Sequence, residues 1–263
     1  MVDAQAPGLA AQLREMAGIP YSGDGWQERL LARLGRLHLV LEGYKRLESL
    51  PPGTQADLRT LVGWTTKQEE LFHRSDAETL GDRWLIVGKH IVEEDKLRVQ
   101  RTWLWGEISQ RAALILSFAY GNQSPDISLV PGTIIEADLV FFKSAYPLRA
   151  LVKTRHGDPT QIEKISGYAT IAEAIAAYTQ ALAKHPWIEQ FPVSLSCVTP
   201  LYRNGHWFVQ DHEGHSLSLS SRFDRGWQLL ALSGGHPVAL FGEWTGDKLV
   251  PLSVCAEGRF WHC

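Results

Sequence analysis

Apolar residues recur at helical spacing through the first third of the chain. Leu9, Leu13 and Met16 form the first such set, and Pro7 suits a first helical turn. A longer helix follows, and Pro51 and Pro52 end it. Its apolar stripe consists of Trp26, Leu30, Leu34, Leu37, Leu41 and Tyr44. The pattern predicts a helical region over residues 1–80.

The other face of the long predicted helix is basic. It carries Arg29, Arg33, Arg36, Lys45 and Arg46. We interpret it as a solvated face because Glu28, Glu42 and Glu48 dilute its charge. The alternative is a contact for an acidic partner.

At Asp82 the pattern changes from helical to alternating. Predicted strands cover residues 84–87, 97–105, 112–120, 134–142 and 146–153. The third and fourth are apolar on both faces, which is typical of central strands in a sheet that is covered on both sides. The sequence therefore predicts a central, antiparallel-rich β block over residues 81–155.

The most distinctive stretch of this block runs from Arg98 to Tyr120. Because side chains alternate along a strand, Arg101, Trp103 and Trp105 share one face. One interpretation is a core strand, with Arg101 as the exposed or partner-facing group. The other is a surface on which Arg and indole together grip a protein or a base. Arg98, Arg101, Trp103 and Trp105, with Arg29, Arg33 and Arg36, are thus the candidate binding residues.

The last region, residues 156–263, is predicted to be a helix followed by a β-meander. Thr170 and Glu173 form a capping box before a helical stripe that Pro186 ends. Asn204 and Gly205 then form the strongest hairpin signal in the chain, because this dipeptide accepts the positive φ values of a type I′ turn. Together the three regions predict an α+β fold.

Composition narrows the possible functions. The 263 residues carry a formal net charge of -3, which argues against non-specific binding to nucleic acid. Three widely spaced cysteines without a CxxC pair indicate a reducing, cytoplasmic environment. The first residues lack the basic start and apolar core of a signal peptide. No stretch approaches the roughly 18 apolar residues of a membrane span, so no membrane association is predicted.

No catalytic set emerges from the residues. There is no phosphate-binding glycine loop and no GxGxxG. Ser233 lacks the GxSxG context of a nucleophile elbow, and a hairpin is expected after it. The best metal candidate is a loop with three histidines and two acids, but its turn-like spacing favours exposed polarity over a zinc site. It contains His206, Asp211, His212, Glu213 and His215.

A weaker partial metal site is formed by Cys255, His262 and Cys263. The acidic clusters are sequence neighbours, which do not face one another as acid/base pairs must. We therefore predict no catalytic residue, no metal ligand and no cofactor.

Several segments in a fixed order resemble the bacterial SWIM zinc-finger family proteins. They are VDAQAPGLA, LLARLGRLHLVLEGYKRLESLP, DRWLIVG, QRTWLWG with LSFA, YPLRALVK, ALSGG and FGEW. In that family a Cys-x-Cys and Cys-x-His module lies upstream of this region. The chain has neither spacing, so it resembles the C-terminal region of such a protein without the finger. Either Met1 is an internal methionine of a longer protein, which is the expectation we favour, or the finger is absent from this gene.

The resemblance implies an accessory role. Similar bacterial proteins are encoded beside a MoxR-type AAA ATPase and a von Willebrand A-domain protein. The leading expectation is a non-enzymatic accessory or scaffold protein that binds other proteins, these two among them. One alternative is a nucleic-acid-associated protein that uses the basic or Arg/Trp surface. The other is a hydrolase with the His206–His215 loop as its site.

Overall fold

The computed structural model describes residues 6–64, 68–73, 77–94, 97–121, 123 and 125–263. They divide into two compact units. The first comprises Met1–Glu78, Phe142–Pro147 and Ala181–Trp187, and the second comprises Thr79–Phe141, Leu148–Gln180 and Ile188–Cys263. The predicted α+β class is confirmed, with N-terminal helices followed by two antiparallel sheets. In the described part of the chain, no helix has both the length and the apolar character needed to cross a membrane.

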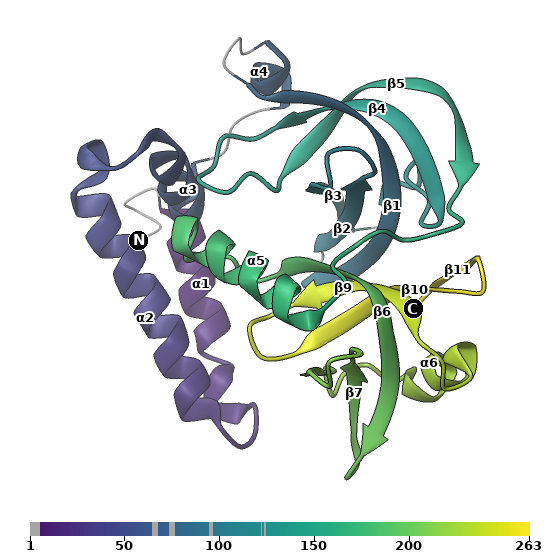
Figure 1. The fold of residues 1–263 in the computed structure, drawn as a ribbon. Helices are drawn as coiled ribbons and strands as arrows, with labels where there is room; N and C mark the ends of the chain where they lie inside the picture. Colours follow the sequence, from purple (N-terminus) through teal and green to yellow (C-terminus); the bar gives the residue numbers. More distant parts are fainter. Residues whose placement is uncertain (1–5, 65–67, 74–76, 95–96, 122, 124) are drawn as a thin grey trace. The chain divides into compact units, whose positions relative to one another are not determined.

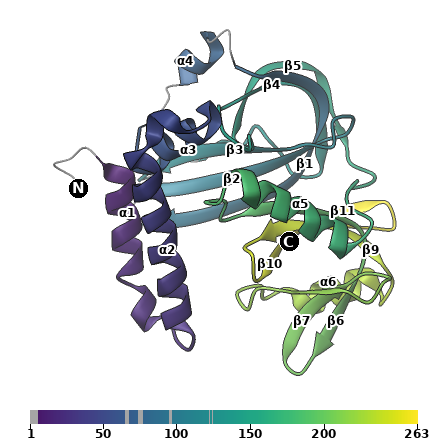
Figure 2. The same cartoon turned by 60° about the vertical axis from the view of Figure 1, so that its left-hand side comes forward.

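The first unit is built on three helices, α1 (Pro7–Met16), α2 (Trp26–Lys45) and α3 (Pro52–Val62), with the short α4 (Gln68–His73) after them. Figures 1 and 2 show α1 and α2 running side by side. The helices share a core of Ala6, Leu9, Val40, Leu58 and Val62. The two helices approach closely at Gly43, where a Cβ would lie 3.0 Å from Cδ1 of Leu58.

The rotation of α2 differs from the sequence expectation. Val40 and Gly43 are buried, whereas Leu34 and Leu41 of the predicted stripe are 46% and 44% exposed. The close approach of Leu58 to Gly43 explains the difference, because it turns this side of α2 toward α3. Part of the apolar side of α2 is therefore exposed.

The second unit begins with a five-stranded sheet in the order β3-β2-β1-β4-β5. Its strands are β1 (Thr79–Glu94), β2 (Leu97–Gly106), β3 (Ala112–Tyr120), β4 (Thr133–Phe141) and β5 (Ala150–Gln161). β3 ends this order, so its predicted central position is wrong. The sheet instead curls until its ends meet, where the backbone N–H of Leu114 donates to the carbonyl of Leu148 at 2.7 Å and Leu114 bridges Arg149. Because the sheet closes in this way, β3 has a neighbouring strand on each side at Leu114, which explains the apolar sequence around this residue.

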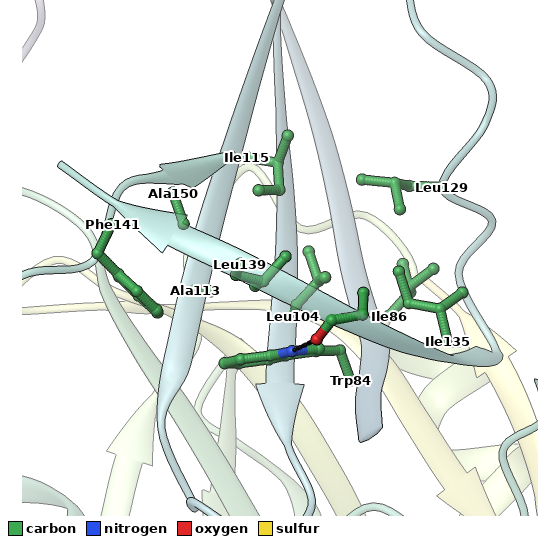
Figure 3. Close-up of a cluster of buried hydrophobic side chains, with 11 residues drawn as sticks. Trp84, Ile86, Leu104, Ala113, Ile115, Leu129, Ile135, Leu139, Phe141 and Ala150 are labelled. Carbon is green, nitrogen blue, oxygen red and sulfur yellow. Dashed lines mark hydrogen bonds between the residues drawn. The ribbon is translucent and has the colours of Figure 1, made fainter. Parts of the chain in front are cut away.

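Inside the curled sheet lies a buried cluster around Trp84 (Figure 3). Trp84 is fully buried among Ile86, Leu104 and Leu139, and its indole Nε1 donates to the carbonyl of Ala137 at 3.0 Å. The next residue along β1, Leu85, points to the opposite face and belongs to a different cluster. This alternation gives the sheet an apolar surface on both sides.

The loop predicted at His156–Pro159 is part of β5. A register shift between Ile134 and Glu136 of β4 accommodates it, and Gly157 has φ 64°. A bulge of this kind lets one strand carry extra residues without ending the ladder.

A second sheet has the order β11-β10-β9-β6-β7-β8. Its strands are β6 (Phe191–Arg203), β7 (His206–Gln210), β8 (Ser216–Ser218), β9 (Val238–Trp244), β10 (Leu249–Ala256) and β11 (Arg259–His262). It packs on the first sheet through Trp103, Trp105, Phe241 and Leu252, together with Leu85 and Val87.

Two local predictions in this region are confirmed. Asn204 and Gly205 join β6 to β7 with φ values of 50° and 82°. The helix α5 (Ile171–Lys184) begins at the predicted capping box, where the backbone N–H of Glu173 donates to Oγ1 of Thr170 at 3.2 Å and Oε2 of Glu173 accepts from the Thr170 N–H at 3.3 Å.

The predicted meander is interrupted by a helix, α6 (Gly226–Ser233). Gly234 ends it in the left-handed conformation with φ 56°, as a glycine after a helix commonly does. The residues after Ser233 therefore do not form the expected hairpin, because Ser233 is the last residue of a helix.

Candidate functional site

Arg101 of β2 forms a two-pronged ion pair with Glu243 of β9. Its Nε donates to Oε1 of Glu243 at 2.9 Å, and its Nη2 donates to Oε2 at 2.8 Å. The indole Nε1 of Trp103 donates to the same Oε1 at 2.8 Å. Glu243 is only 2% exposed, so these donors replace the water that its buried carboxylate has lost.

His90 lies beside this ion pair, opposite Arg101 in the β1–β2 ladder. Burial lowers the pKa of His90, the carboxylate of Glu243 raises it, and the guanidinium of Arg101 lowers it further. The net effect is a lowered pKa, so the ring is neutral at neutral pH. With its charges matched across two sheets, the cluster is suited to holding the sheets together.

The core interpretation of the two tryptophans is confirmed. Trp103 is fully buried and Trp105 is 4% exposed. The ring of Trp103 packs near Phe241 and that of Trp105 near Tyr168. Neither indole is presented to a partner or a base. The Arg101 side chain is 18% exposed.

Glu243 is the residue of this cluster that sequence reasoning missed. It stands between Phe241-Gly242 and Trp244 in an apolar strand. A single acidic residue in such a strand indicates that its carboxylate has a buried hydrogen-bond donor as partner, because burying an unpaired carboxylate costs much free energy. Nothing local identifies that partner, which lies 142 residues away along the chain.

The other candidate arginines are spread over both units. Arg98 pairs with Glu93 at 2.8 Å on the β1–β2 hairpin. Arg29 ties down the loop before α2, since its guanidinium donates to the carbonyl of Asp24 at 2.8 Å and to Oγ of Ser22 at 2.8 Å. Arg33 and Arg36 are half-buried on the side of α2 that carries Val40 and Gly43. Arg29, Arg33 and Arg36 thus belong to the first unit and the Arg98–Trp105 segment to the second.

The exposed surface of α2 combines polar residues, such as Arg29 and His38, with large apolar side chains. Four of the apolar residues, which we call the α2 stripe, are Leu31, Leu34, Leu41 and Tyr44, with exposures of 70%, 46%, 44% and 36%. Helical spacing places them along one side of the helix. His38 and Lys45 follow Leu34 and Leu41 by four positions, so these two exposed polar side chains lie on the same side of the helix, and Lys45 pairs with Glu42 at 2.6 Å. Large apolar side chains exposed along one side of a helix mark an interaction surface.

The histidine-rich loop brings together only part of its predicted set. Ligand atoms of Asp211, Glu213 and His215 lie within 4.8 Å of one another. His206 and His212 do not join this group of described residues. Asp211 is committed to the backbone, because its carboxylate accepts from the N–H groups of Ile171 at 2.8 Å, His215 at 2.9 Å and Glu213 at 3.1 Å.

Electrostatics supports a structural role for Asp211. Burial raises its pKa, but the backbone donors of Ile171, His215 and Glu213 outweigh burial and hold the pKa below its usual range. The carboxylate thereby fastens the β7–β8 turn to the first residue of α5.

The C-terminal candidates point to different partners. Sγ of Cys255 donates to the carbonyl of Glu163 at 3.2 Å, and Nε2 of His262 lies 3.1 Å from the carbonyl of Lys89. Burial raises the pKa of the Cys263 thiol to about 11, which keeps it protonated at neutral pH. Ser233 donates to the carbonyl of Leu230 at the end of α6. All three cysteines are free thiols.

A known protein-family model matches the N-terminal helices. Residues 1–62 match the model of the SWIM-associated four-helix bundle domain. The match covers α1, α2 and α3, and it includes every residue of the core that these helices share. It thus agrees with the sequence resemblance over this region. No curated protein matches the chain.

Proposed function

We propose that this chain is a non-enzymatic accessory protein of a SWIM-associated system that binds another protein through the α2 stripe. The observation that carries the proposal is the exposure of Leu31, Leu34, Leu41 and Tyr44 on a helix whose other side is packed. Burying such side chains contributes about 25 cal/mol for each Å² of apolar surface removed from water.

An amphipathic helix of the partner is the occupant that fits this surface. Laid along α2, such a helix would present its side chains to the stripe at helical spacing.

The sequence resemblance suggests which protein supplies the partner helix. We propose the MoxR-type AAA ATPase or the von Willebrand A-domain protein that accompanies similar bacterial proteins. The three free thiols support a reducing, cytoplasmic setting for this assembly.

The experiment is a binding titration of the purified chain against the ATPase and the A-domain protein from the same genome. The doubly substituted variant Leu34→Glu, Leu41→Glu should weaken binding by at least about a hundredfold, because two charges would enter an apolar contact. Leu39→Glu is the matched control, since Leu39 is 49% exposed on the same helix but off the stripe.

Two results would contradict the proposal. One is that neither protein binds the wild-type chain. The other is that the Leu39 control loses binding as fully as the stripe variant. A labelled DNA duplex included in the same assay tests the nucleic-acid alternative, and tight binding to it would favour that alternative.

A further inference from the structure

The edge of the first sheet is open along the second half of β3. The bridge between Leu114 and Arg149 closes the curled sheet at one point, where the backbone N–H of Leu114 donates to the carbonyl of Leu148. Within the described part of the chain, residues 116–120 have β2 as their one strand partner. The second half of β3 is thus an edge strand.

The hydrogen bond of Leu114 fixes which backbone groups face the open side. In an antiparallel pair, the N–H and carbonyl of one residue point to the partner strand and those of the next point away. Because the N–H of Leu114 points away from β2, those of Leu116, Phe118 and Tyr120 do so as well. We call these three residues the β3 edge row. The carbonyl of Tyr120 also accepts from the N–H of Gln123 at 3.2 Å, which leaves its second lone pair.

The side chains of the β3 edge row are apolar and lie on one face of the sheet. Leu116 is half-buried, whereas Phe118 is 53% and Tyr120 63% exposed. Val99 and Leu97 of β2, which stand opposite Phe118 and Tyr120 in the ladder, are half-buried. The two exposed rings therefore continue an apolar surface toward the open edge, where a further strand would cover them.

The β3 edge lacks the features that keep sheet edges from pairing with other chains. These features are charged side chains, proline and bulges. β5, at the other end of the strand order, has Lys153, Arg155 and Pro159, and its register against β4 shifts. The stretch from Leu116 to Tyr120 has no charge and no proline, and its register against β2 is unbroken.

A second copy of this chain fits the open edge. Two β3 strands that pair antiparallel around Phe118 place Phe118 opposite itself and Leu116 opposite Tyr120 of the other copy. Each outward N–H then faces an outward carbonyl, as in the hydrogen-bonded pairs of an antiparallel ladder. The facing side chains are all apolar, and the same surface serves both copies, as a twofold axis requires.

We propose that this chain forms a twofold dimer in which two β3 edges pair and join the first sheets of both copies. The contact is confined to Leu116–Tyr120 and is smaller than the roughly 1,200–2,000 Å² of stable interfaces, so the dimer forms only at high concentration. The β3 edge lies in the second unit and α2 in the first. The dimer and the binding of a partner to α2 therefore stand or fall separately.

Sedimentation equilibrium of the full chain, over at least about a hundredfold range of concentration, tests the dimer. The mass should rise from that of the monomer toward that of the dimer. Phe118→Lys should raise the dissociation constant at least about tenfold, because it brings two like charges together at the twofold axis. Ile108→Lys is the matched control and should dimerise as the wild type does, because Ile108 is 80% exposed in the β2–β3 turn, away from the edge. The Leu34→Glu, Leu41→Glu variant should also dimerise normally.

Cysteine cross-linking tests the register. Phe118→Cys should give a disulfide-linked dimer when an oxidant is added, because Cα atoms in a hydrogen-bonded pair lie about 5.5 Å apart, within the span of a disulfide. Tyr120→Cys should not cross-link above the background of the wild-type cysteines, because it faces Leu116 of the other copy.

Three results would overturn the proposal. A chain that is monomeric at every concentration would leave the edge to an extended segment of another protein. Loss of the dimer in Ile108→Lys or in the α2 variant, to the extent seen in Phe118→Lys, would place the contact elsewhere. Cross-linking of Tyr120→Cys in preference to Phe118→Cys would contradict the register.

Discussion

Replacing Trp103 by alanine tests whether its strand belongs to the core. The side chain is fully buried, so its removal loses apolar burial and leaves a cavity, at a cost of roughly 3–5 kcal/mol. Glu243 also loses one of its donors, which adds about 1–3 kcal/mol, although Arg101 still neutralises the charge. A domain is typically stable by only about 5–15 kcal/mol, so Trp103→Ala should be barely folded or insoluble.

A milder change separates the two contributions. Trp103→Phe keeps an aromatic ring in the site and removes the indole N–H, so it should cost less than the alanine change. Urea denaturation followed by circular dichroism gives both free energies of unfolding. A soluble Trp103→Ala protein with the wild-type midpoint would refute the burial argument and return this strand to the candidate binding surfaces.

Three further predictions concern other parts of the chain. Gly205→Val should lower the free energy of unfolding by about 1–2 kcal/mol, because a β-branched residue resists the φ of 82° at this position, and Gly205→Asn should lower it less. Equal denaturation midpoints for the wild type and both variants would mean that the turn conformation is misassigned. Asp211→Ala should destabilise the protein at neutral pH. Because the pKa of Asp211 is lowered in the folded state, the stability difference between wild type and variant should shrink as the pH falls below about 4. A stability difference that does not change with pH would contradict the structural role of the Asp211 carboxylate. Elemental analysis should find well under one zinc per chain, because the finger spacing is missing and Asp211 is bonded to backbone N–H groups; stoichiometric zinc that survives dialysis would revive the cluster with Glu213 and His215.

The sequence predicted best what depends on neighbouring residues. The capping box at Thr170 and Glu173 and the turn at Asn204 and Gly205 are short-range features, in which a side chain or a positive φ satisfies the local backbone. The α6 helix was missed although Gly234 carries a helix-ending signal, because only a short apolar stretch precedes it and such stretches fit strands as well.

Long-range packing was beyond the sequence pattern. The periodicity of α2 identified a helix but not its rotation, which depends on the contact of Gly43 with Leu58. The partner of Arg101 was equally hidden, because it comes from a distant strand. For the same reason, the open edge of β3 is defined only by the distant contact of Leu114 with Leu148 and Arg149.

The long-range ties of the first sheet also bear on how the chain folds during synthesis. Oγ of Ser253 donates to the carbonyl of Val87, and Glu243 secures Arg101 and Trp103. The strands that are synthesised first therefore expose apolar surface until β9 and β10 leave the ribosome. At about 5–20 residues per second, the stretch from Gly106 to Ala256 takes roughly 7–30 s to synthesise. During that interval the nascent second unit is open to aggregation and is a natural client for chaperones. Truncation before β10 should leave it in that state permanently.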